Sequence, residues 1–239
     1  MSWKDKLIIA LDVSTPEKAL DIVDMLGDDI NIYKVGFELF FSTGPSIVEK
    51  LHAKGKRVFL DLKFHDIPNT VSKAAVAAAR HGVYMLNLHA SGGLAMMKRC
   101  RDTVNDVCAK ENLPHPKIIA VTVLTSIDSE TLKNDLCMQH GVKAQVRQLS
   151  SMAQKAGLDG VVASPQEISI IKNACGKDFL VVTPGIRPSW VPPDDQHRTA
   201  TPQTAIKEGA DYIVMGRGVL KHEDPVRALE LISLEILTA

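Results

Sequence analysis

The sequence has few features of proteins that work outside the cell, at membranes or on nucleic acids. Its 239 residues include four cysteines and no C-x-x-C pair, and 28 basic residues balance 28 acidic ones. No apolar run reaches the length of a membrane span, and residues 1–6 show no secretory signal. We therefore expect a soluble cytoplasmic protein without nucleic-acid or membrane partners. Its reduced, partly buried cysteines are expected in helices: Cys100, Cys108, Cys137 and Cys175.

Short β-branched or apolar runs alternate with segments of helical period along the whole chain. This alternation is typical of a parallel sheet with helical crossovers, and the length suits one α/β barrel. We predict a single-domain (β/α)8 TIM barrel over residues 1–239. Its eight strands are expected at residues 7–11, 31–35, 57–62, 85–89, 118–124, 160–163, 179–183 and 212–215.

The predicted helices carry signals at both ends. Ser14 is expected to cap the first helix, with Glu17 completing a capping box, and residues 224–237 are expected to form a capped final helix. A doubly wound open sheet would use the same units, but eight units and the lack of a G-x-G-x-x-G turn after the first strand favour a closed barrel. Several helices are expected to end at a glycine: Gly27, Gly55, Gly82, Gly157, Gly176 and Gly209.

Polar residues gather where the predicted strands end, which is the active-site end of such a barrel. Asp61 and Lys63 are two residues apart and would share a strand face, with Asp66 after a short turn. Opposite charges that alternate at a poorly solvated rim compensate one another and keep a lysine protonated. Such a lysine can stabilise negative charge and then donate a proton. Other strand ends contribute Asp12, Lys34, Asn87, His89, Thr125 and Ser126.

Several of the polar residues near this rim also have a structural explanation. Asp66 could cap the helix that begins near Pro68, and Lys34 could extend its ammonium to solvent from a strand end. Asp12 could cap its turn with Ser14, while His65 and His89 could be structural histidines. Their occurrence together at one predicted rim favours a functional site.

The last two strands are followed by glycine and arginine. Gly216-Arg217-Gly218 follows the eighth strand, and Gly185-Ile186-Arg187 follows the seventh. Glycine lets backbone N–H groups approach an anion, and arginine suits phosphate oxygens. Barrels commonly bind phosphate at these loops. The long connection at residues 186–202 is therefore expected to be a lid on the phosphate side.

The chain resembles the bacterial orotidine 5′-phosphate decarboxylases. The most specific motif is Asp61-Leu62-Lys63-Phe64-His65-Asp66-Ile67-Pro68-Asn69-Thr70, and further matching blocks occur along nearly the whole sequence. The resemblance implies loss of CO2 from orotidine 5′-phosphate to give UMP, the last step of de novo pyrimidine synthesis, without metal or organic cofactor. It also implies a homodimer with shared active sites.

The resemblance assigns roles to particular residues. Lys63 would donate a proton to C6 within a charged array that also contains Asp61, Lys34 and the partner subunit's Asp66. Asp12, Lys34, Asp66 and Thr70 would reach the ribose, and Thr125 and Ser126 the pyrimidine. Gln196, Gly216 and Arg217 would hold the phosphate, with Arg187 near the same end.

Two rivals remain open. A metal-dependent sugar-phosphate aldolase or decarboxylase of the same superfamily also carries D-x-K-x-x-D, but tends to have glutamate where this chain has Lys34, and a cation there would oppose a metal. A non-catalytic sensor of phosphorylated ligands would need the phosphate-binding loops, but it would not need Lys63 between two carboxylates.

Overall fold

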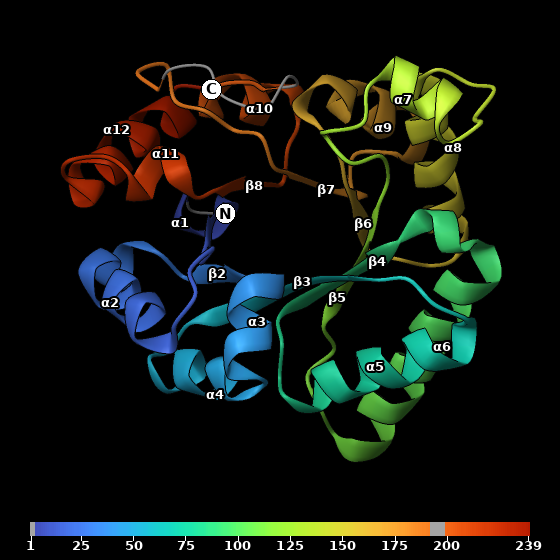
Figure 1. Ribbon diagram of the computed structural model, residues 1–239, viewed down its shortest axis with the longest axis horizontal. Helices are drawn as coiled ribbons and strands as arrows, with labels where there is room; N and C mark the ends of the chain where they lie inside the picture. Colours follow the sequence, from blue (N-terminus) through green and yellow to red (C-terminus); the bar gives the residue numbers. More distant parts are fainter. Residues whose placement is uncertain (1–2, 192–198) are drawn as a thin grey trace.

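The computed structural model describes residues 3–191 and 199–239 and contains a closed barrel of parallel strands (Figure 1). The strands pair in sequence order, and β1 closes the ring by pairing with β8. The predicted barrel is thus confirmed. The strands are β1 Leu7–Ala10, β2 Ile32–Val35, β3 Arg57–Phe64, β4 Met85–His89, β5 Lys117–Val121, β6 Gly160–Val162, β7 Leu180–Thr183 and β8 Tyr212–Met215.

Helices surround the barrel on its outer side (Figure 1). They are α1 Trp3–Lys6, α2 Pro16–Leu26, α3 Phe37–Thr43, α4 Ser46–Ala53, α5 Pro68–Arg80, α6 Leu94–Glu111, α7 Ser129–Asn134, α8 Val142–Lys155, α9 Ile168–Cys175, α10 Pro202–Glu208, α11 Arg217–Leu220 and α12 Pro225–Leu237. Short 3-10 turns lie at Gly27–Asp29, Ala90–Gly92 and Pro165–Glu167. Within residues 3–191 and 199–239, no helix is long and apolar enough to cross a membrane.

The strands are buried on both faces, as expected of a parallel sheet covered by helices. One apolar cluster fills the barrel and includes Ile8, Ile32, Phe59 and Met85. A larger cluster packs the outer face of the sheet against the helices. At the amino end of the strands the hydroxyl groups of Tyr84 and Tyr212 form a hydrogen bond of 2.8 Å. Because apolar side chains fill the interior of the barrel, a binding site can form only above them, at the carboxyl ends of the strands.

The predicted helix signals are largely confirmed, with one correction. All six helix-terminal glycines have positive φ, and the Asp224 carboxylate caps α12 by accepting the Arg227 N–H. The prediction that Ser14 caps the first helix is wrong. Thr15 is the cap, and its hydroxyl accepts the Lys18 N–H. The Ser14 hydroxyl instead donates to Glu38.

Two further predictions need correction. Cys137 is exposed and lies outside any helix, at a positive φ of 52°, whereas the other three cysteines are buried in helices. The fifth strand ends at Val121, three residues before the predicted end. At that point both the Thr122 N–H and its hydroxyl donate to the Val162 carbonyl, and the chain then turns, with Ile127 N–H donating to Leu124.

The carboxyl end of β3 is irregular. In the pairing with β4, Leu60 lies opposite Leu86 and Phe64 lies opposite Leu88, so three residues of β3 oppose the single residue Asn87. Lys63, within this bulge, has a φ of 44°. A left-handed conformation is unfavourable for a residue with a β-carbon and persists only where its surroundings hold it. Bulges commonly redirect a side chain beside an active site.

Candidate active site

The inward-facing residues near the carboxyl ends of the strands divide into a charged and an apolar half. On β2 and β3, Lys34 and Asp61 stand two residues after the interior residues Ile32 and Phe59. Alternation in a strand places them on the same inner face. The cavity above the barrel core is lined by Lys34, Asp61 and Lys63 on one side and by Val121, Val123, Leu124, Thr125, Val162, Ala163, Pro184 and Val214 on the other.

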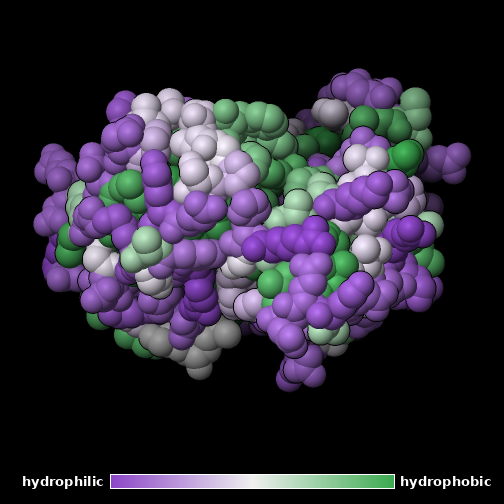
Figure 2. Space-filling view, turned by 90° about the horizontal axis from the view of Figure 1, so that it is seen from below, coloured by the Kyte–Doolittle hydropathy of each residue, from purple (hydrophilic) through white to green (hydrophobic). Residues whose placement is uncertain are grey.

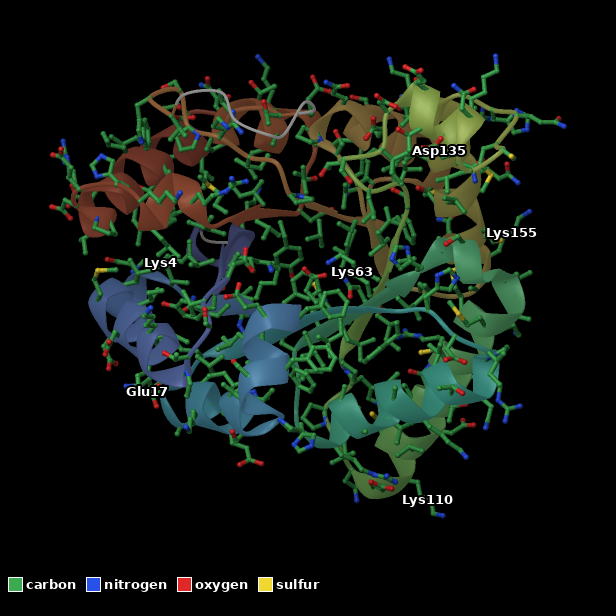
Figure 3. All side chains as sticks on the ribbon, in the orientation of Figure 1. Lys4, Glu17, Lys63, Lys110, Asp135 and Lys155 are labelled. Carbon is green, nitrogen blue, oxygen red and sulfur yellow. The ribbon has the colours of Figure 1, made fainter. Side chains whose placement is uncertain are left out.

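The charged residues form a continuous chain of ion pairs. Lys34 Nζ lies 2.8 Å from Asp12 Oδ1 and 3.4 Å from Asp61 Oδ2. Lys63 Nζ lies 2.8 Å from Asp61 Oδ1. Figure 3 shows Lys63 near the middle of the ring formed by the surrounding helices. The structure thus brings together four of the residues that the sequence indicated, in the order Asp12, Lys34, Asp61 and Lys63.

Lys34 is held in its charged form by the neighbouring carboxylates. Its side chain and that of Asp61 are each only 12% exposed. Burial by itself lowers the pKa of Lys34, but the charges of Asp61 and Asp12 and their hydrogen bonds outweigh it and leave the pKa raised. The Lys34 ammonium therefore stays protonated and occupies the space between the two carboxylates.

Asn87 joins this network; the sequence placed it among the polar strand ends at the rim but gave it no role in the site. It is completely buried on β4. Its Nδ2 donates to Asp61 Oδ1 over 2.7 Å, and its Oδ1 accepts the Lys63 backbone N–H over 2.8 Å. A polar residue in the middle of the apolar strand sequence Met-Leu-Asn-Leu was the available signal.

Lys63 has a mixed environment. Its Nζ lies over the ring of Phe37, 5.6 Å from the centroid, and its side chain is 27% exposed. Asp61 receives hydrogen bonds from both Lys63 and Asn87 on the same oxygen. The Lys63 ammonium therefore reaches the cavity while an anion and a buried amide fix its position.

A second, more polar cavity adjoins the first and shares Lys34, Pro184 and Val214 with it. Its lining includes Arg187 and Arg217, and the glycines 185, 216 and 218. A β-carbon at Gly216 would lie 3.3 Å from that of Ala10. Two arginines and exposed backbone make this end suited to an anion such as phosphate. The two cavities together fit an elongated ligand with one anionic end.

The remaining predicted site residues lie at the edge of this region or outside the described residues. Thr125 lines the first cavity, whereas Ser126 is exposed on the following turn. Asp66 and Thr70 are exposed, and the Asp66 carboxylate accepts the Ile67 N–H at the start of α5. This contact, at the residue before α5, resembles the helix-capping role that the sequence allowed for Asp66. Gln196 lies outside the described residues.

His65 and His89 lie side by side, with ring centroids 5.2 Å apart. Burial lowers the pKa of His89, and His65 and Lys63 lower it further. The two rings line a separate, mostly apolar pocket behind residues 122–124. They therefore lie beside the charged chain and not within it.

Within the described ranges 3–191 and 199–239, no three or more histidine, cysteine, aspartate or glutamate side chains are grouped as a metal site would require. The Lys34 ammonium lies between Asp12 and Asp61 and pairs with both. It therefore occupies the space that a metal ion bound by these two carboxylates would need.

Comparison with known proteins identifies the family of this chain. Residues 5–232 match the model of the "Orotidine 5'-phosphate decarboxylase / HUMPS family". The orotidine 5′-phosphate decarboxylase of Moorella thermoacetica is 48% identical over 236 residues, covering 99% of this chain and 94% of that protein. The corresponding protein of Saccharophagus degradans is 50% identical over 234 residues, covering 98% and 96%.

A solved structure of the same family is also similar to this chain. The crystal structure of the orotidine 5′-phosphate decarboxylase from Lactobacillus acidophilus has a TM-score of 0.85 and 39% sequence identity, and the match covers 97% of this chain and 99% of that one. The comparisons confirm an enzyme of the carboxy-lyase type, as expected from the sequence. The chain belongs to the orotidine 5′-phosphate decarboxylase / HUMPS family.

Proposed function

We propose that this protein converts orotidine 5′-phosphate to UMP and CO2 without a metal ion, with Lys63 as the proton donor. The observation that carries the proposal is the ammonium of Lys63, held 2.8 Å from Asp61 at the mouth of a cavity with an apolar far wall. Loss of CO2 leaves the electron pair of the broken bond on C6, in the plane of the ring, where the ring cannot delocalise it. An oriented ammonium in a poorly solvated site stabilises such a centre.

The proton then passes from Lys63 Nζ to C6, which forms the new C–H bond and leaves a neutral amine. Solvent reprotonates this amine before the next turnover. Asp61 pairs with the Lys63 ammonium and orients it before the reaction, and Lys34 balances the charge of Asp61. Because Asp61 is buried and anionic, a substrate carboxylate beside it is repelled, which adds to the drive for decarboxylation.

The two cavities divide the substrate between them. The pyrimidine is assigned to the first cavity, beside Thr125 and Ser126. The ribose is assigned to Asp12 and Lys34, where the two cavities meet, with Asp66 and Thr70 supplied across a dimer interface. The phosphate is assigned to the second cavity, with Gly216, Arg217 and Arg187. Gln196, which the resemblance adds to this set, lies outside the described residues.

Phosphate binding far from C6 supplies energy that can order the site for reaction. We assign residues 1–239 to a single domain and closure over the phosphate to residues 186–202 as a lid, of which residues 192–198 lie outside the described residues. Arg187, at the start of this segment, lines the phosphate-side cavity, and its backbone N–H donates to the carbonyl of Ala200 near the other end. The expected cytoplasmic location stays a prediction.

The dimer is supported by an apolar surface beside Lys63. The side chains of Phe37, Phe41 and Ile67 are 49%, 80% and 67% exposed, and the Phe37 and Phe41 rings stack with centroids 6.2 Å apart. Phe37 also contacts the Lys63 ammonium. Figure 2 shows the face on the α4 and α5 side, where hydrophobic groups gather in a hollow among hydrophilic ones. Burial of this surface against a second copy would bring the partner's Asp66 toward Lys63.

Replacement of Lys63 by alanine tests the proposed chemistry. The Lys63→Ala protein should form no UMP from orotidine 5′-phosphate, because no other ammonium stands at the same point, yet it should still bind UMP through the phosphate-side cavity. Titration calorimetry with UMP and a spectrophotometric assay measure the two properties. Unchanged turnover would refute the mechanism, while the non-catalytic sensor predicts no turnover by the unaltered protein.

Mixed dimers test the shared site. An Asp66→Asn protein and a Lys63→Ala protein, each inactive, should regain part of the activity when their subunits exchange, because one site in the mixed dimer then has both residues. Native mass spectrometry verifies exchange. Continued inactivity of a proven mixture would contradict the contribution of Asp66 from the partner.

A further inference from the structure

Asn87 occupies a position that no function described above explains. Its side chain is completely buried at the carboxyl end of β4. The amide oxygen accepts the Lys63 N–H over 2.8 Å, and the amide nitrogen donates to Asp61 over 2.7 Å. A backbone N–H can only donate and an ionised carboxylate can only accept, so these partners fix the orientation of the amide.

These two hydrogen bonds bridge the irregular part of β3. Residues 61–63 have only Asn87 opposite them on β4, so the regular strand ladder is interrupted there. The amide oxygen accepts the Lys63 N–H at this interruption and so satisfies a backbone donor within the bulge. Lys63 meanwhile adopts the unfavourable φ of 44°. Asn87 therefore holds both the backbone of the lysine and the carboxylate with which its ammonium pairs.

We propose that Asn87 is a positioning residue, which sets the direction of the Lys63 ammonium by clamping the β3 bulge and the Asp61 carboxylate in one fixed arrangement. This inference rests on the proposed role of Lys63. Asn87 acts through its two neighbours and needs no contact with the substrate. Its loss should therefore affect the chemical step more than the binding of the phosphorylated ligand.

The first test is Asn87→Ala, measured with orotidine 5′-phosphate. A displacement of a reacting group by about 1 Å can reduce a rate on the order of 100-fold, and we expect a fall in kcat of that size. KM and the affinity for UMP should change little, because the phosphate-side cavity is unaltered. The matched control is Tyr84→Phe, which removes a partly buried hydrogen bond at the opposite end of the barrel and should keep the kcat of the unaltered protein.

The second test, Asn87→Asp, adds a readout that a merely structural role would not change. When protonated, the introduced carboxyl group can donate to Asp61 and accept from the Lys63 N–H, as the amide does. When ionised, it repels Asp61. Burial and the neighbouring Asp61 charge raise its pKa, so activity should be highest in acid and fall as pH rises through that pKa, unlike the activity of the unaltered protein. This variant also keeps the size of the side chain if the alanine variant does not fold.

The outcomes separate this inference from the proposed function. A low kcat with retained UMP affinity for Asn87→Ala, together with a new alkaline loss of activity for Asn87→Asp, supports the positioning role. If Lys63→Ala is inactive but both folded Asn87 variants keep full kcat and an unaltered pH profile, the positioning role is refuted and the function stands. If Lys63→Ala is fully active, the proposed function itself fails.

Discussion

Removal of the Lys34 ammonium should destabilise the fold, because it leaves a buried carboxylate with less compensation. Two unit charges 3.4 Å apart, as between Lys34 and Asp61, attract by about 5 kcal/mol at an effective dielectric constant of about 20. Desolvation of both groups offsets part of this attraction. Asp61 also keeps its bonds to Lys63 and Asn87. We therefore expect Lys34→Met to lower the free energy of unfolding by about 3 kcal/mol, which is the lower end of the range for removing one partner of a buried ion pair.

Urea unfolding of the two proteins at neutral pH measures this difference. The matched control is Lys4→Met, which removes a lysine–aspartate pair of 2.7 Å with Asp29 that is 34% and 48% exposed and should cost less than about 1 kcal/mol. Because the pKa of Lys34 is raised in the fold, its contribution is complete below its unfolded pKa of about 10.4 and is lost as pH rises through the folded value. Equal stability of Lys34→Met and the unaltered protein at neutral pH would refute this reasoning.

Two further predictions follow from the same region. Gly36→Ala places a β-carbon 3.1 Å from Lys34 Nζ, so kcat/KM for orotidine 5′-phosphate should fall about tenfold. The control Gly141→Ala, whose added β-carbon has no atom within 4 Å, should keep the activity of the unaltered protein. Equal activities of the two variants would contradict a tightly held Lys34. Because the pKa of His89 is lowered in the fold, the unfolded chain takes up a proton at this histidine at a higher pH than the folded chain does. The free energy of unfolding therefore falls as pH drops below about 6.5. His89→Asn should reduce this acid loss in urea unfolding between about pH 7 and about pH 5, and an unchanged loss would count against it.

Most of the fold could be predicted because the strands of a parallel barrel are buried on both faces and interrupted by helices of regular period. The errors lie where side chains compete with the backbone. The N–H and the hydroxyl of Thr122 both donate to the same carbonyl group of β6, and β5 therefore ends earlier than predicted. Ser14 and Thr15 can both cap a helix, but α2 begins at Pro16, so Thr15 holds the cap position, and the Ser14 hydroxyl donates to Glu38 on α3 instead.

The charged chain could be predicted because strand alternation and barrel geometry bring Asp12, Lys34 and Asp61 to one rim. The direction of Lys63 could not, since regular alternation does not include the bulge or the φ of 44°. The role of Asn87 was hidden for the same reason. Its two partners lie 24 and 26 residues away, and only the irregular pairing of β3 and β4 brings them to one amide.

The most direct test of the whole account is an assay of the unaltered protein with orotidine 5′-phosphate after exhaustive chelation. The account predicts that UMP forms at the same rate with and without the chelator, because Lys63 and Asp61 supply the charge that a metal would otherwise provide. Loss of activity on chelation, restored by a divalent cation, would contradict the metal-free mechanism and favour the metal-dependent alternative.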